Sequence, residues 1–213
     1  MALSGKRTQS RGRLRRVELL EAARCLLRER EVQQITLPDI AASAGIPRAS
    51  AYHFFSDVQD VFRAVAEVVG AELLIWQENI DLETCADWRQ IVEAYIRRGA
   101  NFFRENVDAS QLLIGPYTPP IVKLSDRESD LKLARQLLGM ISGRYCVPLI
   151  DNGDAKFYHA IEIADLLFCL SNIRFGHITP EYEDEAIIAS ISYLSVYIPS
   201  ILSLPKDVNQ EMP

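Results

Sequence analysis

Apolar residues recur at three- and four-residue intervals along the whole of this 213-residue chain, and no sustained alternation of apolar and polar residues occurs. That interval is typical of an α-helix, which brings every third or fourth side chain to one face, whereas a half-buried strand alternates. With 48% hydrophobic residues the chain can also bury a core. The sequence therefore predicts an all-α protein of about nine helices. These are expected near residues 14–29, 36–44, 48–55, 58–73, 87–104, 110–114, 126–149, 154–175 and 180–202.

Two of the expected helices are short and are joined by a tight turn. Thr36 suits the cap before the first of them, and Asp39 stands where the acid of a capping box would. Gly45 ends that helix because glycine tolerates the left-handed conformation. Pro47 then suits the first turn of the next helix, since its fixed φ is already helical. A third helix precedes the pair, so the segment is predicted to be a helix-turn-helix, the second short helix of which enters the major groove of DNA.

The second short helix has two different faces. Ala41 and Ala44 on the first helix allow close packing, so the second helix can stand out from the body. Its helical register turns one set of side chains outward and the other toward the core. The outward set is expected to be Arg48, Ala49, Ser50 and His53, and the inward set Ala51, Phe54 and Phe55. An arginine can pair with a guanine edge, a serine can read either strand, and a small residue can touch a thymine methyl.

Charge is distributed unevenly along the chain. Residues 1–30 hold nine basic and three acidic side chains, a net charge of +6, whereas the remaining 183 residues carry a net charge of −12. Such asymmetry is expected when one end of a chain meets a polyanion. Residues 1–11 are polar and basic, with nothing to bury, and are expected to form a flexible arm.

The helix-turn-helix segment closely resembles that of the TetR family of transcriptional regulators. The matching residues are Thr36, Ile40-Ala41, Ala44-Gly45, Tyr52 and Phe54-Phe55. The resemblance implies that DNA is bound by Thr36, Arg48, Ala49, Ser50, Tyr52 and His53, with Tyr52 mostly at phosphate. Two positions depart from the family pattern. Pro47 replaces a capping Ser or Thr, and Val58 replaces a lysine that touches phosphate, a loss for which the basic arm compensates.

The resemblance also implies an architecture and partners. It implies a basic arm at residues 1–11, a helix-turn-helix domain at 12–57, a helical ligand-binding and dimerisation domain at 58–205, and a tail at 206–213. It further implies a cytoplasmic homodimer that represses from a pseudo-palindromic double-stranded DNA operator and is released by a small-molecule effector. Most aromatic residues are ordinary core taken singly, but a subset is expected to line the ligand site. The candidates are Trp88, Tyr95, Phe102, Tyr117 and Tyr145.

Other chemistry finds little support in the sequence. The four cysteines show no C-x-x-C spacing and no paired histidines, so neither a metal site nor a cofactor is expected. A redox sensor that uses Cys85, Cys146 or Cys169 is the alternative kind of regulator. Paired carboxylates, a nucleophile elbow and a phosphate-binding glycine loop are all missing from the sequence, so we do not expect an enzyme. A purely structural adaptor would not need the basic arm or an outward Arg48.

The last two expected helices are apolar on more than one face. Residues 186–205 contain no charge and are long enough to span a membrane. They also contain five serines, two tyrosines and Pro199, which favours a helix buried in protein. A helix that is apolar all round must be covered on every side, so these two helices are predicted to pair with those of a second subunit. Ile191 and Tyr193 are expected at that interface.

Overall fold

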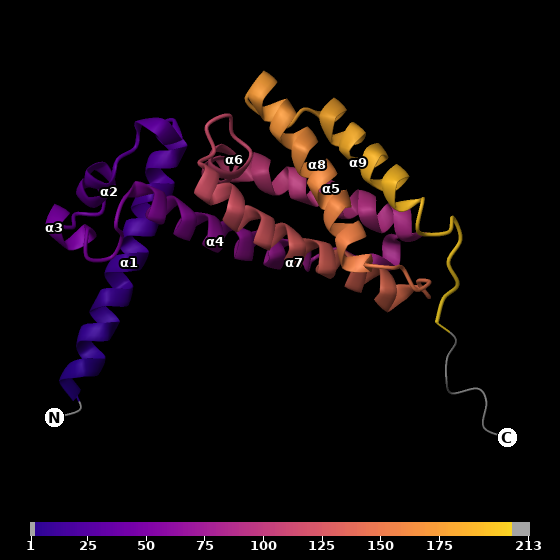
Figure 1. Ribbon diagram of the computed structural model, residues 1–213, viewed down its shortest axis with the longest axis horizontal. Helices are drawn as coiled ribbons and strands as arrows, with labels where there is room; N and C mark the ends of the chain where they lie inside the picture. Colours follow the sequence, from indigo (N-terminus) through magenta and orange to yellow (C-terminus); the bar gives the residue numbers. More distant parts are fainter. Residues whose placement is uncertain (1–2, 206–213) are drawn as a thin grey trace. The chain divides into compact units, whose positions relative to one another are not determined.

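The computed structural model of the chain describes residues 3–205, with side chains from Gly12 onward, and all regular structure within that range is helical (Figure 1). The helices there are α1 Leu3–Glu29, α2 Leu37–Ser43, α3 Arg48–Ala51, α4 Val58–Gln77, α5 Trp88–Glu105, α6 Val107–Leu113, α7 Pro120–Arg144, α8 Gly153–Phe175 and α9 Pro180–Leu194. Short 3₁₀ turns occupy Val32–Gln34 and Leu82–Thr84. Across this range the predicted all-α fold is confirmed, including its nine α-helices.

The helices form two compact units. The first contains residues 3–71 and 105–127, and the second contains residues 72–104 and 128–205. The first unit therefore includes α6 in addition to the three helices of the expected helix-turn-helix domain. The boundaries predicted at residues 11, 57 and 205 stay predictions.

In the first unit, α1 packs against both α2 and α6. Leu19 and Leu27 of α1 lie on one face and are fully buried, as are Ile40 of α2 and Leu112 of α6. This stripe is the apolar face expected for the first helix. The helix begins earlier than predicted, because the backbone from Leu3 onward already belongs to α1. No proline interrupts residues 3–29, so the backbone of most of the segment expected to be a flexible arm is helical.

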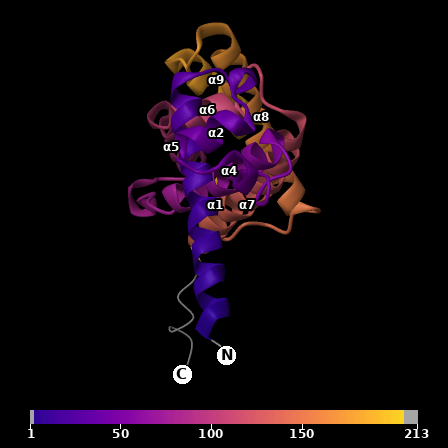
Figure 2. The same cartoon turned by 90° about the vertical axis from the view of Figure 1, so that its left-hand side faces the viewer.

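In the second unit, α8 and α9 lie side by side in both views (Figure 1 and Figure 2). Gly176 ends α8 with a positive φ of 76°, and Thr179 caps α9 by accepting a hydrogen bond from the Tyr182 amide. The core of this unit contains the fully buried side chains of Trp88, Tyr95 and Phe157. The last two helices therefore pack against each other within one chain, and their pairing with a second subunit stays a prediction.

Prolines explain where two helices differ from their predicted extent. Pro119-Pro120 was expected to be a break, yet Pro120 is the first residue of α7, a position that needs no N–H donor. That helix ends at Arg144 instead of 149, because Pro148 restricts the residue before it. Similarly, α9 ends at Leu194, five residues before Pro199. Among the described residues, no helix is long and apolar enough to cross a membrane.

Two glycines offer a stability test of the backbone. A Cβ at Gly115 would lie 2.2 Å from the backbone oxygen of Gln111, whereas a Cβ at Gly139 within α7 would meet nothing within 4 Å. Gly115→Ala is expected to lower the free energy of unfolding by at least about 1 kcal/mol, because backbone must shift. Gly139→Ala is expected to raise it by about 0.5–1 kcal/mol through helix propensity. Urea denaturation of both variants checks this, and equal effects would contradict the backbone path at Gly115.

Candidate functional site

The start of α2 is fixed by a reciprocal pair of hydrogen bonds. The Asp39 amide donates to Thr36 Oγ1 at 3.4 Å, and the Thr36 amide donates to Asp39 Oδ2 at 3.0 Å. These bonds satisfy two amides that have no partner within the helix. The pKa of the Asp39 carboxyl is held below its usual range, first by the hydrogen bond that the Thr36 hydroxyl donates to it and then by the bond from the Thr36 amide. The capping box predicted from the sequence is confirmed, and it leaves the Thr36 residue exposed at the surface.

The turn between α2 and α3 is built on a left-handed glycine. Gly45 has a φ of 64°, and the Ile46 amide donates to the Ala41 carbonyl at 2.9 Å. Ala41 is buried, so the two short helices approach each other closely. Pro47 follows as the residue that precedes α3, with a φ of −55°. Pro47 forms no side-chain hydrogen bond with the start of α3. Its ring instead fixes φ at a value close to that of a helix.

The face of α3 agrees with the sequence prediction in its exposure. Arg48, Ala49, Tyr52 and His53 are exposed and Ser50 is partly exposed. Of the three residues expected to face the core, Ala51 and Phe55 are buried and Phe54 is partly exposed. Regular helix covers only Arg48–Ala51, four residues fewer than predicted. The chain then continues as hydrogen-bonded turns, in which the Phe55 amide donates to the Ala51 carbonyl at 3.1 Å. The Arg48 guanidinium lies 5.8 Å from the centre of the Tyr52 ring, so a cation and a phenol stand together on this face.

The base of α3 rests on α1. The Arg16 guanidinium lies 4.9 Å from the centre of the Phe55 ring, and a Cβ at Gly12 would lie 3.8 Å from the Phe54 ring. Because Gly12 has no side chain, this turn of α1 can lie close to the Phe54 ring, just after α3. Arg16 of the basic segment therefore contacts the buried side of the segment that follows α3.

A buried ion pair joins α1 to α6. Asp108 is fully buried and accepts hydrogen bonds from Arg24 Nε at 2.5 Å and from Arg28 Nε at 3.2 Å. Gln111 on the next turn of α6 donates to the Leu27 carbonyl at 2.7 Å. Burial alone would raise the pKa of Asp108, but the hydrogen bonds and charges of the two arginines lower it below the usual value. The sequence analysis missed this ion pair. The available signal was Arg24, a charged residue next to Ala23 of the apolar stripe.

The expected ligand-site aromatics separate into two groups. Trp88, Tyr95, Phe102 and Tyr145 are buried in the second unit, whereas Tyr117 belongs to the first unit and is 49% exposed. The polar ends of three buried rings are occupied. Trp88 Nε1 donates to the Pro199 carbonyl and the Tyr145 hydroxyl donates to the Cys85 carbonyl, while the single Tyr95 hydroxyl proton is shared between the Leu133 carbonyl and Gln136 Oε1. Four of the five candidates therefore belong to the second unit and Tyr117 to the first, and the role of all five in ligand binding stays a prediction.

Phe102 lies in a run of edge-to-face rings within the second unit. Its centre is 6.0 Å from Trp76 and 5.8 Å from Phe103, and Phe103 lies 6.4 Å from Phe168 of α8. Such contacts stabilise a core beyond simple burial. The run connects α4, α5 and α8.

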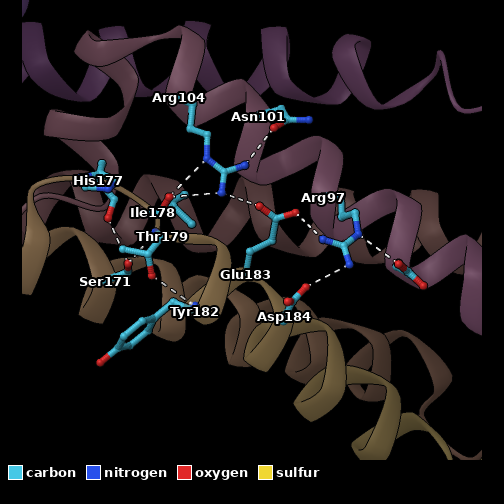
Figure 3. Close-up of polar contacts among 11 residues, drawn as sticks. Arg97, Asn101, Arg104, Ser171, His177, Ile178, Thr179, Tyr182, Glu183 and Asp184 are labelled. Atoms are coloured by element: carbon cyan, nitrogen blue, oxygen red, sulfur yellow. Dashed lines mark hydrogen bonds and ion pairs between the residues drawn. The ribbon is translucent and has the colours of Figure 1, made fainter.

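A cluster of arginines and carboxylates fixes α9 to α5 (Figure 3). Glu183 is buried between Arg97, whose Nη1 lies 2.8 Å away, and Arg104, with which it also forms an ion pair. Arg104 also donates to the Ile178 carbonyl just before α9, and Arg97 reaches Asp184 at 3.0 Å. A buried carboxylate held by two arginines fixes the first turn of α9 in place. Within residues 12–205 no group of three or more His, Cys, Asp or Glu is arranged to hold a metal ion.

Comparisons with known proteins agree with this geometry. Residues 19–65 match the family model of bacterial regulatory proteins, tetR family. That match spans α2, α3 and the turn between them, together with parts of α1 and α4. No curated protein sequence matches the chain.

Solved structures share the fold over most of the chain. A TetR-family transcriptional regulator from Streptomyces coelicolor is 19% identical, covers 86% of this chain and 99% of its own, and gives a TM-score of 0.67. A TetR transcriptional regulator from Rhodococcus sp. RHA1 is 17% identical, with coverages of 87% and 97% and a TM-score of 0.63. RolR in complex with its ligand resorcinol is 18% identical, with coverages of 86% and 89% and a TM-score of 0.62. Residues 19–65 thus carry a tetR-family helix-turn-helix, and the whole chain has the fold of the TetR-family transcriptional regulators.

Proposed function

We propose that the chain is a cytoplasmic, homodimeric repressor that binds an operator in double-stranded DNA and is released from it by a small molecule. DNA is contacted by Thr36, Arg48, Ala49, Ser50, Tyr52 and His53. The observation that carries the proposal is the face of α3, where exposed polar residues stand on a buried base, Ala51 and Phe55. A short helix that presents such a face after a capped helix and a glycine turn suits the major groove.

Arg48 is expected to supply most of the base recognition. Arg48→Ala should lower affinity for the operator by about 5- to 150-fold, equivalent to about 1–3 kcal/mol, and relax preference at one position in each half-site. Arg135→Ala is the matched control, because Arg135 is an exposed arginine of the second unit that pairs with Asp154 at 2.8 Å. Fluorescence anisotropy titrations measure both variants. Wild-type operator affinity in Arg48→Ala would place base recognition elsewhere.

Response to a small molecule is supported by the second unit. Its helices α5, α7 and α8 enclose buried aromatic and polar side chains, which a purely structural core does not need. RolR, which has a similar fold, is solved with resorcinol. A ligand that favours the conformation unable to bind DNA would release the operator by shifting the population.

The homodimer is supported by an apolar face on α8 and α9. Leu166, Leu170 and Ile173 on α8 and Ile188 on α9 are between 44% and 58% exposed. Their spacing along α8 places them on one side of the helix. A second copy of this chain is the occupant that we propose, because a helix-turn-helix reads two half-sites when it is paired. Ile191 and Tyr193 are only partly exposed, and the Tyr193 hydroxyl lies 2.9 Å from His159 Nδ1 of the same chain.

Redox sensing through the cysteines is the alternative proposal. Its support is the exposed Cys146, whereas Cys85 is buried and Cys169 is partly exposed. Alkylation of the thiols with and without oxidant separates the two proposals. The redox sensor would be favoured if oxidant treatment both protects a cysteine from alkylation and abolishes operator binding.

A further inference from the structure

Three polar side chains form a connected group inside the second unit. Gln77 at the end of α4 is 2% exposed, and its Nε2 donates to the Tyr95 carbonyl at 3.0 Å. The Tyr95 hydroxyl lies 2.9 Å from Gln136 Oε1 on α7, and Gln136 Nε2 donates to the Leu74 carbonyl at 3.0 Å. An interior built only for packing would use apolar side chains here, because each buried polar group must be paired.

One atom of this group has no partner. Gln77 Oε1 is buried and accepts no hydrogen bond from the residues that the structure describes, whereas both ends of the Gln136 amide are engaged. The bond from Gln77 Nε2 to a carbonyl fixes which end of the amide is the free acceptor. Leaving such an acceptor unpaired is unfavourable, and native proteins rarely do so without a reason.

A second buried amide oxygen without a hydrogen-bond partner among the described residues lies in the first unit. Gln111 Oε1 in the first unit also lacks a partner, but the Gln111 residue is partly exposed. The Gln111 oxygen atom is buried like that of Gln77, but it belongs to the first unit, whereas Gln77 belongs to the second. The two glutamines form a matched pair for an experiment.

Gly99 of α5 lies near both the Gln77 amide and an aromatic ring of α8. A Cβ at Gly99 of α5 would lie 3.4 Å from Gln77 Nε2 and 4.0 Å from the Phe168 ring of α8. Phe168 in turn contacts Phe103 edge-to-face. A bound molecule that reaches the Gln77 amide would therefore place an apolar or aromatic body against these rings.

The electrostatics at this place disfavour a negative charge. Burial of the Tyr95 hydroxyl, and then the buried carboxylate of Asp130, raise its pKa well above the ordinary value. A carboxylate brought to Gln77 Oε1 would place one acceptor against another, so it would lose its hydration without gaining a hydrogen bond there.

We infer that the effector is an uncharged or cationic small molecule with an aromatic body, whose O–H or N–H group donates a hydrogen bond to Gln77 Oε1. This inference rests on the proposed function, because it names the chemistry of the ligand to which the second unit responds. Carboxylates and phosphates are excluded as the group that meets Gln77.

Phenol, toluene and benzoate, titrated into the full chain by calorimetry, test the inference. Wild type should bind phenol about five- to tenfold more tightly than toluene, because only phenol donates to Oε1, and benzoate should not bind. Gln77→Met should remove the preference for phenol, and Gln111→Met should keep it. Should Gln77→Met fail to fold, the side-chain amide resonances of Gln77 in ¹⁵N-glutamine-labelled wild type should shift with phenol and not with toluene.

Equal binding of phenol and toluene, absence of phenol binding, benzoate binding, or a preference retained in Gln77→Met would each overturn the inference. Operator binding by the same wild-type preparation is measured in parallel. An operator bound normally without any preference for phenol means that the ligand chemistry alone is wrong. Loss of any sequence-specific DNA binding would instead contradict the proposed function.

Discussion

Replacing Asp108 by alanine is expected to lower the free energy of unfolding by about 3–5 kcal/mol. Asp108 is fully buried, and its two carboxylate oxygens receive Arg24 and Arg28 from α1. Arg24 is itself buried, so the variant removes the carboxylate from a buried ion pair. Breaking a buried ion pair by removing one partner is far more costly than losing a surface ion pair.

Chemical denaturation at pH 7 measures this effect against a matched control. Asp184→Ala removes an exposed aspartate that pairs with Arg97, and it is expected to cost less than about 1 kcal/mol. A change in Asp108→Ala as small as the control would contradict the buried pair between α1 and α6.

The same variant should also show a characteristic pH dependence. The arginines lower the pKa of Asp108 in the folded protein below its usual value, so the pair stabilises the fold when the pH lies above the pKa of the unfolded chain. The difference between wild type and Asp108→Ala should therefore be complete at neutral pH and should shrink as the pH falls below about 4. A difference that grows on acidification would contradict the ion pair.

Disrupting the face of α8 and α9 should abolish operator binding. Leu170→Arg and Ile188→Arg each place a charge where a second copy is proposed to pack, so both variants are expected to be monomers. A monomer offers one recognition helix instead of two held about 34 Å apart, and its affinity for the operator should fall by about 10²-fold or more. Analytical ultracentrifugation and anisotropy titrations measure assembly and binding on the same samples.

Leu149→Arg is the matched control for these variants, because Leu149 is fully exposed in the second unit and lies outside α8 and α9. It should stay dimeric, with a mass of about twice the 24.1 kDa of one chain, and bind the operator like wild type. Dimeric Leu170→Arg and Ile188→Arg proteins that bind normally would show that this face is not the interface.

Local features of the chain could be predicted because their causes lie close together in sequence. The Thr36–Asp39 capping box and the Gly45 turn depend on residues within one helical turn of each other, and both were predicted correctly. The start of α1 was not, because residues before Leu14 show no apolar stripe, and a polar helix has the same pattern as a loop. The early start of α7 was missed because a proline ends one helix and begins another equally well.

Long-range pairs could not be predicted from the sequence. Arg24 and Asp108 are 84 residues apart, and nothing in the local pattern links them. Gln77 and Gln136 have the residue type of a solvated surface, and only the packing of α4, α5 and α7 buries Gln77 and partly buries Gln136. Residue type alone also failed to distinguish the exposed Tyr117 from the buried Tyr95 among the candidates for the ligand site.

Selection of binding sites from a pool of random duplex DNA tests the central claim most directly. The full-length wild-type chain should enrich one pseudo-palindromic sequence, the two half-sites of which lie about one helical turn apart, in accordance with a dimer that carries two copies of α3. The Arg48→Ala protein should enrich the same palindrome with one position per half-site relaxed. A pool without any enriched motif after repeated rounds with folded wild-type protein would contradict sequence-specific DNA recognition by this chain.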